Sequence, residues 1–183
     1  MLMHSLGPFF FMFYGGIMLR EYFTEEEYQR LCKCDDLLYK SLEIAVRLFE
    51  GKNDKSGIPY VVHLLKVYSG VSDYKEKCCA LLHDVKEDTD VTYDDLREVG
   101  FDEEIIEILK ILTKNKGEDY GKYIDRIISS KNIHALNIKL ADLAHNMDIT
   151  RIKNPTVNDY ERINKRYLPA REKILNELEK RRK

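Results

Sequence analysis

The stretch CCALLHDV, residues 78–85, decides the fold. It is apolar on every side of a helix until His83 and Asp84 interrupt it, which predicts a helix in the middle of the molecule. Two polar side chains in such a core are costly unless a metal ion or a full set of hydrogen bonds compensates them. The His-Asp pair is therefore the first candidate functional feature.

Helical patterns extend in both directions from this stretch. Upstream, a capping box from Thr24 to Glu27 opens one long amphipathic helix that runs to Gly51, and Pro59 starts a second helix that ends before Gly70. Downstream, we expect helices over residues 92–99, 102–112, 120–129, 133–150 and 158–180, the last broken near Pro169. The pattern offers no strand pair with turn chemistry. We predict an all-α fold, a compact bundle of seven to nine helices.

Composition limits the class of partner. The chain has 183 residues, 44% hydrophobic and 34% charged, which suits one soluble domain that is stable without a disulfide or a structural metal. The net charge of −2 argues against a nucleic-acid partner, so we expect the partner to be a small molecule. Four cysteines in two tight pairs lack zinc-site spacing and predict reduced thiols in a cytoplasmic protein.

The N-terminus differs from the rest of the chain. Residues 8–19 are almost wholly apolar, but a membrane span needs about 20 apolar residues, and no basic residue precedes Arg20 as a signal peptide would require. We therefore expect no membrane segment, residues 1–17 to be an upstream extension that is not native, and Met18 to be the natural start of a single domain over residues 18–183. An uncleaved signal anchor is the alternative.

Four candidate metal ligands lie on three of the predicted helices, namely His63, His83, Asp84 and Asp142. Two imidazoles and two carboxylates suit Mn, Fe, Co or Zn and leave positions open for water and substrate. Taken singly, His63 could be a partly buried histidine and Asp142 a surface carboxylate. His145, one turn after Asp142, is either a group behind the ligands or an outward residue, and the sequence does not choose.

Glu87 and Asp88 follow Asp84 at i+3 and i+4, so the three carboxylates crowd one side of a helix or its frayed end. Like charges this close raise one another's pKa, which suits proton transfer near neutral pH. A solvated helix end is the alternative. The chain contains no G-x-x-x-x-G-K-[ST] sequence, which disfavours a P-loop enzyme.

Three segments carry a family resemblance: KSGIPYVVH (55–63), LLHDVKEDT (81–89) and KLADLAHNM (139–147). Over roughly residues 45–152 they resemble the hydrolase domain of the RelA/SpoT family and its small stand-alone relatives, within the HD-domain phosphohydrolase superfamily. The resemblance implies an HD-domain helical bundle that removes the 3′-pyrophosphate of ppGpp and pppGpp, usually with one Mn²⁺. It implies metal ligands at His63, His83, Asp84 and Asp142, a catalytic pair at Glu87 and Asp88, and nucleotide contacts at Lys55, Ser56 and Asn146.

The sequence departs from the family pattern at three positions that are usually basic. Asp54 stands where an Arg before the loop Lys could stack on a purine, Leu143 follows the metal-binding Asp142, and Asp148 lies further along the same motif. These changes weaken the argument for guanine and polyphosphate more than the argument for the metal. A nucleoside 5′-monophosphate phosphatase of the same superfamily and a noncatalytic nucleotide or metal sensor are the alternatives, and the oligomeric state is not predicted.

Overall fold

The computed structural model describes residues 19–182, so the expected extension over residues 1–17 and the expected start at Met18 lie outside the described part of the chain. Within that part the regular secondary structure is helical, joined by turns and loops, and one isolated bridge links Asn53 and Pro59. The all-α prediction is confirmed. None of the helices in residues 19–182 is long and apolar enough to cross a membrane.

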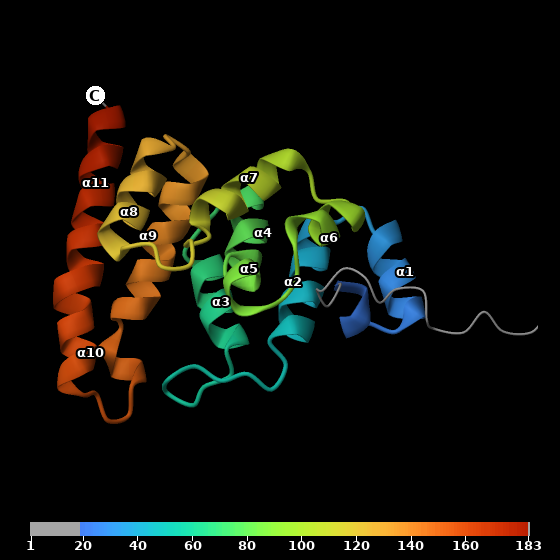
Figure 1. Ribbon diagram of the computed structural model, residues 1–183, viewed down its shortest axis with the longest axis horizontal. Coiled ribbons are helices and arrows are strands. Elements are labelled where there is room, and N and C mark those ends of the chain that lie inside the picture. The colour runs from blue at the N-terminus through green and yellow to red at the C-terminus, as the bar shows by residue number, and fades with distance from the viewer. Residues whose placement is uncertain (1–18, 183) are drawn as a thin grey trace, which may run out of the picture.

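Helix α1 and the long C-terminal helix α11 lie at opposite ends of the molecule, with the other helices between them (Figure 1). In chain order they are η1 (Leu19–Tyr22), α1 (Glu25–Lys33), α2 (Leu37–Leu48), α3 (Val61–Ser69), α4 (Tyr74–Leu82), α5 (Val85–Asp88), α6 (Tyr93–Glu98), α7 (Glu103–Leu112), α8 (Tyr120–Ser129), α9 (Ile133–Met147), η2 (Ile149–Arg151), α10 (Val157–Arg162), η3 (Ile163–Tyr167) and α11 (Leu168–Arg182).

The single long helix predicted from Thr24 to Gly51 is wrong, because the chain breaks between α1 and α2. Cys34 is extended, and the Asp36 carboxylate accepts hydrogen bonds from the first backbone N–H groups of α2, those of Leu38 and Tyr39. The Tyr74 hydroxyl donates to the same carboxylate at 3.0 Å. Asp36 thus starts a new helix where apolar periodicity alone favoured a continuous one. The Thr24–Glu27 capping box is present as predicted.

The predicted central helix also divides, and the division falls at the His-Asp pair. α4 ends at Leu82, His83 and Asp84 form the joint, and α5 continues from Val85. At Asp84 the backbone ψ of −4° departs from the regular helical value, and the Asp84 carbonyl accepts the first hydrogen bonds of α5, from the N–H groups of Glu87 and Asp88. The pair is therefore not inside a helix, as predicted, but at a bend where its side chains can leave the apolar core together.

Helices α3, α4 and α9 pack against one another and form the frame around this bend. α3 ends at Gly70, where a Cβ atom would lie only 2.8 Å from the Cβ of Ala141 on α9. Such a contact is too short for any side chain, so Gly70 lets α3 approach α9 closely. His63 on α3 and Asp142 on α9 are brought together by this approach.

The C-terminal arm is α10, η3 and α11, and it packs along α8 and α9. The predicted break near Pro169 takes the form of a π turn, η3, in which the Leu168 N–H donates to the Ile163 carbonyl. Because Pro169 has no N–H to donate to the Lys165 carbonyl and its ring crowds that group, the preceding turn widens. Helix α9 ends earlier than predicted, at Met147, since Asp148 leaves the helix and caps η2.

Candidate metal centre

The four predicted ligands meet at one point between α3, α9 and the bend after α4. The His63 Nε2 atom lies 3.4 Å from Asp84 Oδ2 and 3.4 Å from Asp142 Oδ1. The His83 Nε2 atom lies 3.2 Å from Asp84 Oδ2 and 3.9 Å from Asp142 Oδ1. His63, His83 and Asp142, from three separate parts of the sequence, thus offer ligand atoms to a common centre, and Asp84 Oδ2 lies beside both imidazoles without belonging to that group.

His83 indicates which kind of ion this centre fits. Its Nδ1–H donates to the Ala80 carbonyl at 2.8 Å, which fixes the tautomer and leaves a lone pair on Nε2. That Nε2 atom is buried and has no hydrogen-bond partner. The ligand atoms of His63, His83 and Asp142 lie within 4.8 Å of one another. A buried imidazole lone pair beside carboxylate oxygens fits a divalent transition metal.

Neighbouring side chains donate hydrogen bonds to each of the two carboxylates. The Lys139 ammonium donates to Asp142 Oδ2 at 2.7 Å, and the Asn146 amide donates to Asp142 Oδ1. The Tyr60 hydroxyl donates to Asp84 Oδ2 at 2.6 Å. These contacts fix the orientation of both carboxylates before any ion binds.

His145 contacts a ligand and does not face outward. Its Nδ1 atom lies 2.7 Å from the Nδ1 atom of His63, so one ring donates to the other. Because His63 presents Nε2 to the two carboxylates, its Nδ1–H is the donor when Nε2 offers a lone pair to an ion. Of the two interpretations left open by the sequence, the structure thus favours a group behind the ligands.

The electrostatics of the centre favour positive charge. Burial lowers the pKa of His63, but the Asp142 and Asp84 carboxylates outweigh it and raise that pKa to about 9. Burial likewise opposes ionisation of Asp84, yet His83 and His63 lower its pKa to about 2. The pKa of Asp142 also lies below its usual range, because Lys139 and the imidazoles outweigh its burial. Two ionised carboxylates therefore attract a cation, either a proton on His63 or a metal ion.

The two acidic residues beyond the ligands differ in position. Glu87 lines the cavity in front of the ligands, where its Oε1 accepts a hydrogen bond from the Lys114 backbone N–H. Asp88 is not among the residues that line this cavity. Burial and the nearby Asp84 charge raise the pKa of both carboxyl groups. Only Glu87 is therefore placed to reach a molecule bound in the cavity directly.

The cavity has a volume of about 430 Å³, enough for a small nucleotide. Of the predicted nucleotide contacts, Lys55 and Asn146 line it, whereas Ser56 does not. The Ser56 backbone N–H donates instead to Asp54 Oδ1 at 2.7 Å, and so does the Ile58 N–H at 3.1 Å. The Ser56 hydroxyl oxygen is buried without a hydrogen-bond partner, and the Ser56 backbone belongs to the loop that carries Lys55.

The structure also explains the departures from the family pattern. Asp54 forms an ion pair with Arg151, and both residues line the cavity, so a guanidinium is present although it comes from η2. Leu143 is fully buried in the core, and Asp148 caps η2 outside the cavity. The basic residues missing from the motifs are thus partly replaced by a cation from elsewhere in the chain.

Several cavity residues were missed by the sequence reasoning. Lys114, Tyr120, Arg162 and Tyr167 line the cavity but belong to none of the three motifs. Arg162 and Tyr167 are five positions apart, and the π turn between them brings both to the same side of the arm. Only Pro169, which marks an irregular helix, gave a signal near them.

Comparison with known proteins gives several matches, although no protein-family model matches the chain. A guanosine-3′,5′-bis(diphosphate) 3′-pyrophosphohydrolase of Borreliella burgdorferi is 33% identical over 154 residues, which are 75% of this chain and 23% of that protein. The bifunctional (p)ppGpp synthase/hydrolase SpoT of Escherichia coli is 29% identical over 143 residues, 71% of this chain and 19% of SpoT. The chain thus spans less than a quarter of the length of these curated relatives.

A solved structure has a similar fold. It belongs to a metazoan ortholog of SpoT that is described as hydrolysing ppGpp. The match has a TM-score of 0.63 and 24% identity, and it covers 79% of this chain and 86% of the other. At that identity the match bears on the fold, and it places the helical bundle described above among known architectures.

Proposed function

Because the chain is related to the RelA/SpoT-type HD-domain hydrolases, as its three motifs predicted, we propose that it removes the 3′-pyrophosphate of ppGpp or pppGpp. The observation that carries this proposal is the convergence of those motifs on one cavity. His63, His83 and Asp142 come one from each of the three motifs, yet all three line it.

In this proposal His63, His83, Asp84 and Asp142 hold one divalent transition metal, for which we expect Mn²⁺. When bound, such an ion polarises a phosphoryl oxygen and lowers the pKa of bound water. The chain's own contribution is the orientation of the donors: Lys139 and Asn146 hold Asp142, and Tyr60 holds Asp84. These contacts reduce the reorganisation that binding requires.

Glu87 is the proposed proton-transfer residue. Its raised pKa lets it take a proton from an attacking water and return it to the leaving group near neutral pH. The Lys114 backbone N–H fixes one carboxylate oxygen and leaves the other for the water. Asp88, which does not line the cavity, acts in this proposal through its charge and through its contact with the Tyr60 hydroxyl.

The cationic side chains of the cavity recognise the phosphates in this proposal. Lys55 and Lys114 line it without an acidic partner within 4.0 Å, in the part of the chain that the structure describes. Arg151 and Arg162 are paired with Asp54 and Asp159 and contribute planar guanidinium groups beside them. We further propose that the protein acts in the cytoplasm, where its free thiols would remain reduced.

The test is to incubate Mn²⁺-loaded protein with ppGpp, pppGpp and a set of nucleoside 5′-monophosphates and to identify the products. We expect GDP from ppGpp, GTP from pppGpp, and pyrophosphate from both. The His83→Ala variant serves as the metal-free control.

Each alternative has its own outcome in this test. Orthophosphate released from the monophosphates, with ppGpp untouched, would establish the phosphatase. Nucleotide binding without any product, with Mn²⁺, Co²⁺, Fe²⁺ or Zn²⁺, would establish the sensor. Either result overturns the proposed hydrolysis of ppGpp.

A further inference from the structure

A second cavity adjoins the candidate active site. Its volume is about 640 Å³, and it lies between the start of α8 and the C-terminal arm formed by η3 and α11. Lys114 and Tyr120 line both cavities, so these two side chains form the boundary between them. None of the proposed metal ligands, nor Glu87, lines the second cavity.

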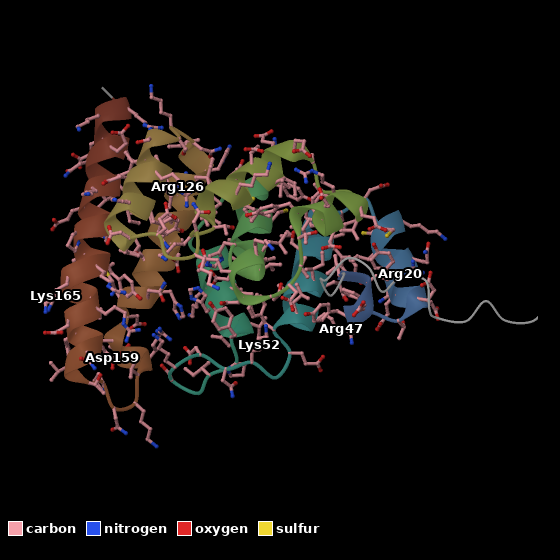
Figure 2. All side chains as sticks on the ribbon, in the orientation of Figure 1. Arg20, Arg47, Lys52, Arg126, Asp159 and Lys165 are labelled. Carbon is pink, nitrogen blue, oxygen red and sulfur yellow. The ribbon has the colours of Figure 1, made fainter. Side chains whose placement is uncertain are left out.

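The second cavity has an excess of available positive charge. Its basic residues are Lys114 at the boundary and Lys165, Arg166 and Lys173 on the arm. Arg166 has no acidic partner within 4.0 Å among residues 19–182. Lys165, which Figure 2 labels, pairs with Glu161, and Lys173 pairs with Asp125. The two lysines and their two partners are each more than half exposed. Exposed ion pairs contribute little to stability, so these two lysines can exchange a carboxylate for another anion at little cost.

The two acidic residues of the same cavity are already engaged. Both oxygens of Glu118 accept hydrogen bonds from Arg126, at 2.9 and 3.0 Å, and one also accepts from the Asn115 N–H. Asp119 caps α8, where its Oδ1 accepts from the Lys122 N–H. Arg126 thus compensates the charge of Glu118, and the four basic residues of the cavity outnumber the remaining carboxylate, Asp119. An added anion would therefore meet a net positive charge.

Tyr120, at the boundary, provides a further donor. Its hydroxyl oxygen is buried and has no hydrogen-bond partner. An unpaired buried hydroxyl costs free energy, and a bound ligand that accepts from it would recover that loss.

Guanosine-3′,5′-bis(diphosphate), the substrate in the proposed function, carries two diphosphate chains on one ribose, and only the 3′ chain is cleaved. We propose that the second cavity binds the other chain, the 5′-polyphosphate, so that the nucleotide lies across the boundary at Lys114 and Tyr120. This inference rests on the proposed function and makes it more specific. The enzyme prefers substrates with a longer 5′ chain, so pppGpp is a better substrate than ppGpp, and ppGpp is better than pGpp.

The experiment measures kcat and KM for pGpp, ppGpp and pppGpp, which share one 3′-diphosphate and differ only in the 5′ chain. The wild-type protein is compared with Arg166→Gln and Lys173→Gln. For each variant we expect the ratio of kcat/KM between pppGpp and pGpp to fall about 5-fold, through KM, as for a partly solvated charge contact. Lys180→Gln, the same change of charge elsewhere on α11, should leave the ratio unchanged.

The outcomes distinguish this inference from the proposed function. If all three nucleotides are cleaved but the variants leave the ratio unchanged, or Lys180→Gln lowers it equally, the second cavity does not hold the 5′ chain. If none of the three is cleaved, the proposed function fails and the inference fails with it. Direct calorimetry of pppGpp with each variant adds a readout that needs no turnover, and Arg166→Gln should weaken this binding by a similar factor.

Discussion

Replacing His145 by leucine should weaken Mn²⁺ binding about 10- to 100-fold, although His145 is not one of the proposed ligands. The reason is the 2.7 Å contact between the Nδ1 atoms of His145 and His63. With His145 as acceptor, the His63 ring is held with Nε2 toward the two carboxylates. Leucine fills a similar volume but accepts no hydrogen bond.

The magnitude follows from the burial of His63, which is 7% exposed. Without its acceptor, the His63 Nδ1–H becomes an unsatisfied buried donor, which costs about 1–3 kcal/mol, or roughly 5- to 150-fold in an equilibrium constant. Part of that loss appears as weaker metal binding, because the ring can then turn to find another acceptor. Asparagine at position 145 offers an oxygen close to the place of Nδ1, so His145→Asn should restore most of the affinity.

The assay is calorimetric titration of the apoprotein with Mn²⁺ at fixed pH. His134→Leu is the matched control, because His134 contacts Glu76 and none of the ligands. If His145→Leu binds Mn²⁺ as tightly as the wild type, or if His145→Asn is as weak as His145→Leu, the contact does not orient His63.

Four further predictions follow from the same site and its surroundings. His83→Ala should lose the metal, and unchanged metal content by elemental analysis would show that the site is misplaced. Glu87→Gln should lower kcat by about 10²- to 10⁴-fold with metal content intact, measured by steady-state kinetics; normal turnover would make Glu87 structural. Asp54→Arg would restore the family's usual residue, but Asp54 accepts two backbone hydrogen bonds and pairs with Arg151. The substitution should therefore raise KM and lower the free energy of unfolding by about 1–3 kcal/mol in denaturant titrations. A lower KM would contradict this. The hydrogen bonds from Arg126 lower the pKa of Glu118 from 4.5 to about 2. The ion pair should therefore stabilise the fold above about pH 5 and lose this effect as the pH falls toward 2. Glu118→Gln should flatten that part of a stability–pH curve.

Much of the fold could be predicted from local signals. Thr92 and Asp102 begin helices as their side chains predicted, and the helix predicted over residues 120–129 has the observed bounds. The break at Asp36 was missed because it depends partly on Tyr74, which is 38 positions away in the sequence. A contact of that kind leaves no trace in periodicity.

The candidate site divides in the same way. Costly polar groups in apolar sequence drew attention to His83 and Asp84, and the motif resemblance pointed to His63 and Asp142. Whether these four residues bind the ion stays a prediction. Arg151 could not be found, because its role depends on its pairing with Asp54 across 97 positions. Sequence reasoning located the groups that are expensive to bury, but of the free cations around them it predicted a role only for Lys55.

The π turn of η3 determines which side chains of the C-terminal arm reach the cavity. A π turn contains one residue more than an α-helical turn, so a chain lacking Asn164 could run from α10 into α11 as a regular helix. Each residue of an α-helix turns about 100°, and the deletion would therefore rotate either Arg162 or Tyr167 away from the cavity. A protein with the shorter arm could keep its packing against α8 and α9 and still lose one of these two side chains from the cavity lining. Homologues that lack one residue at this turn should thus differ more in which nucleotides they accept than in their stability.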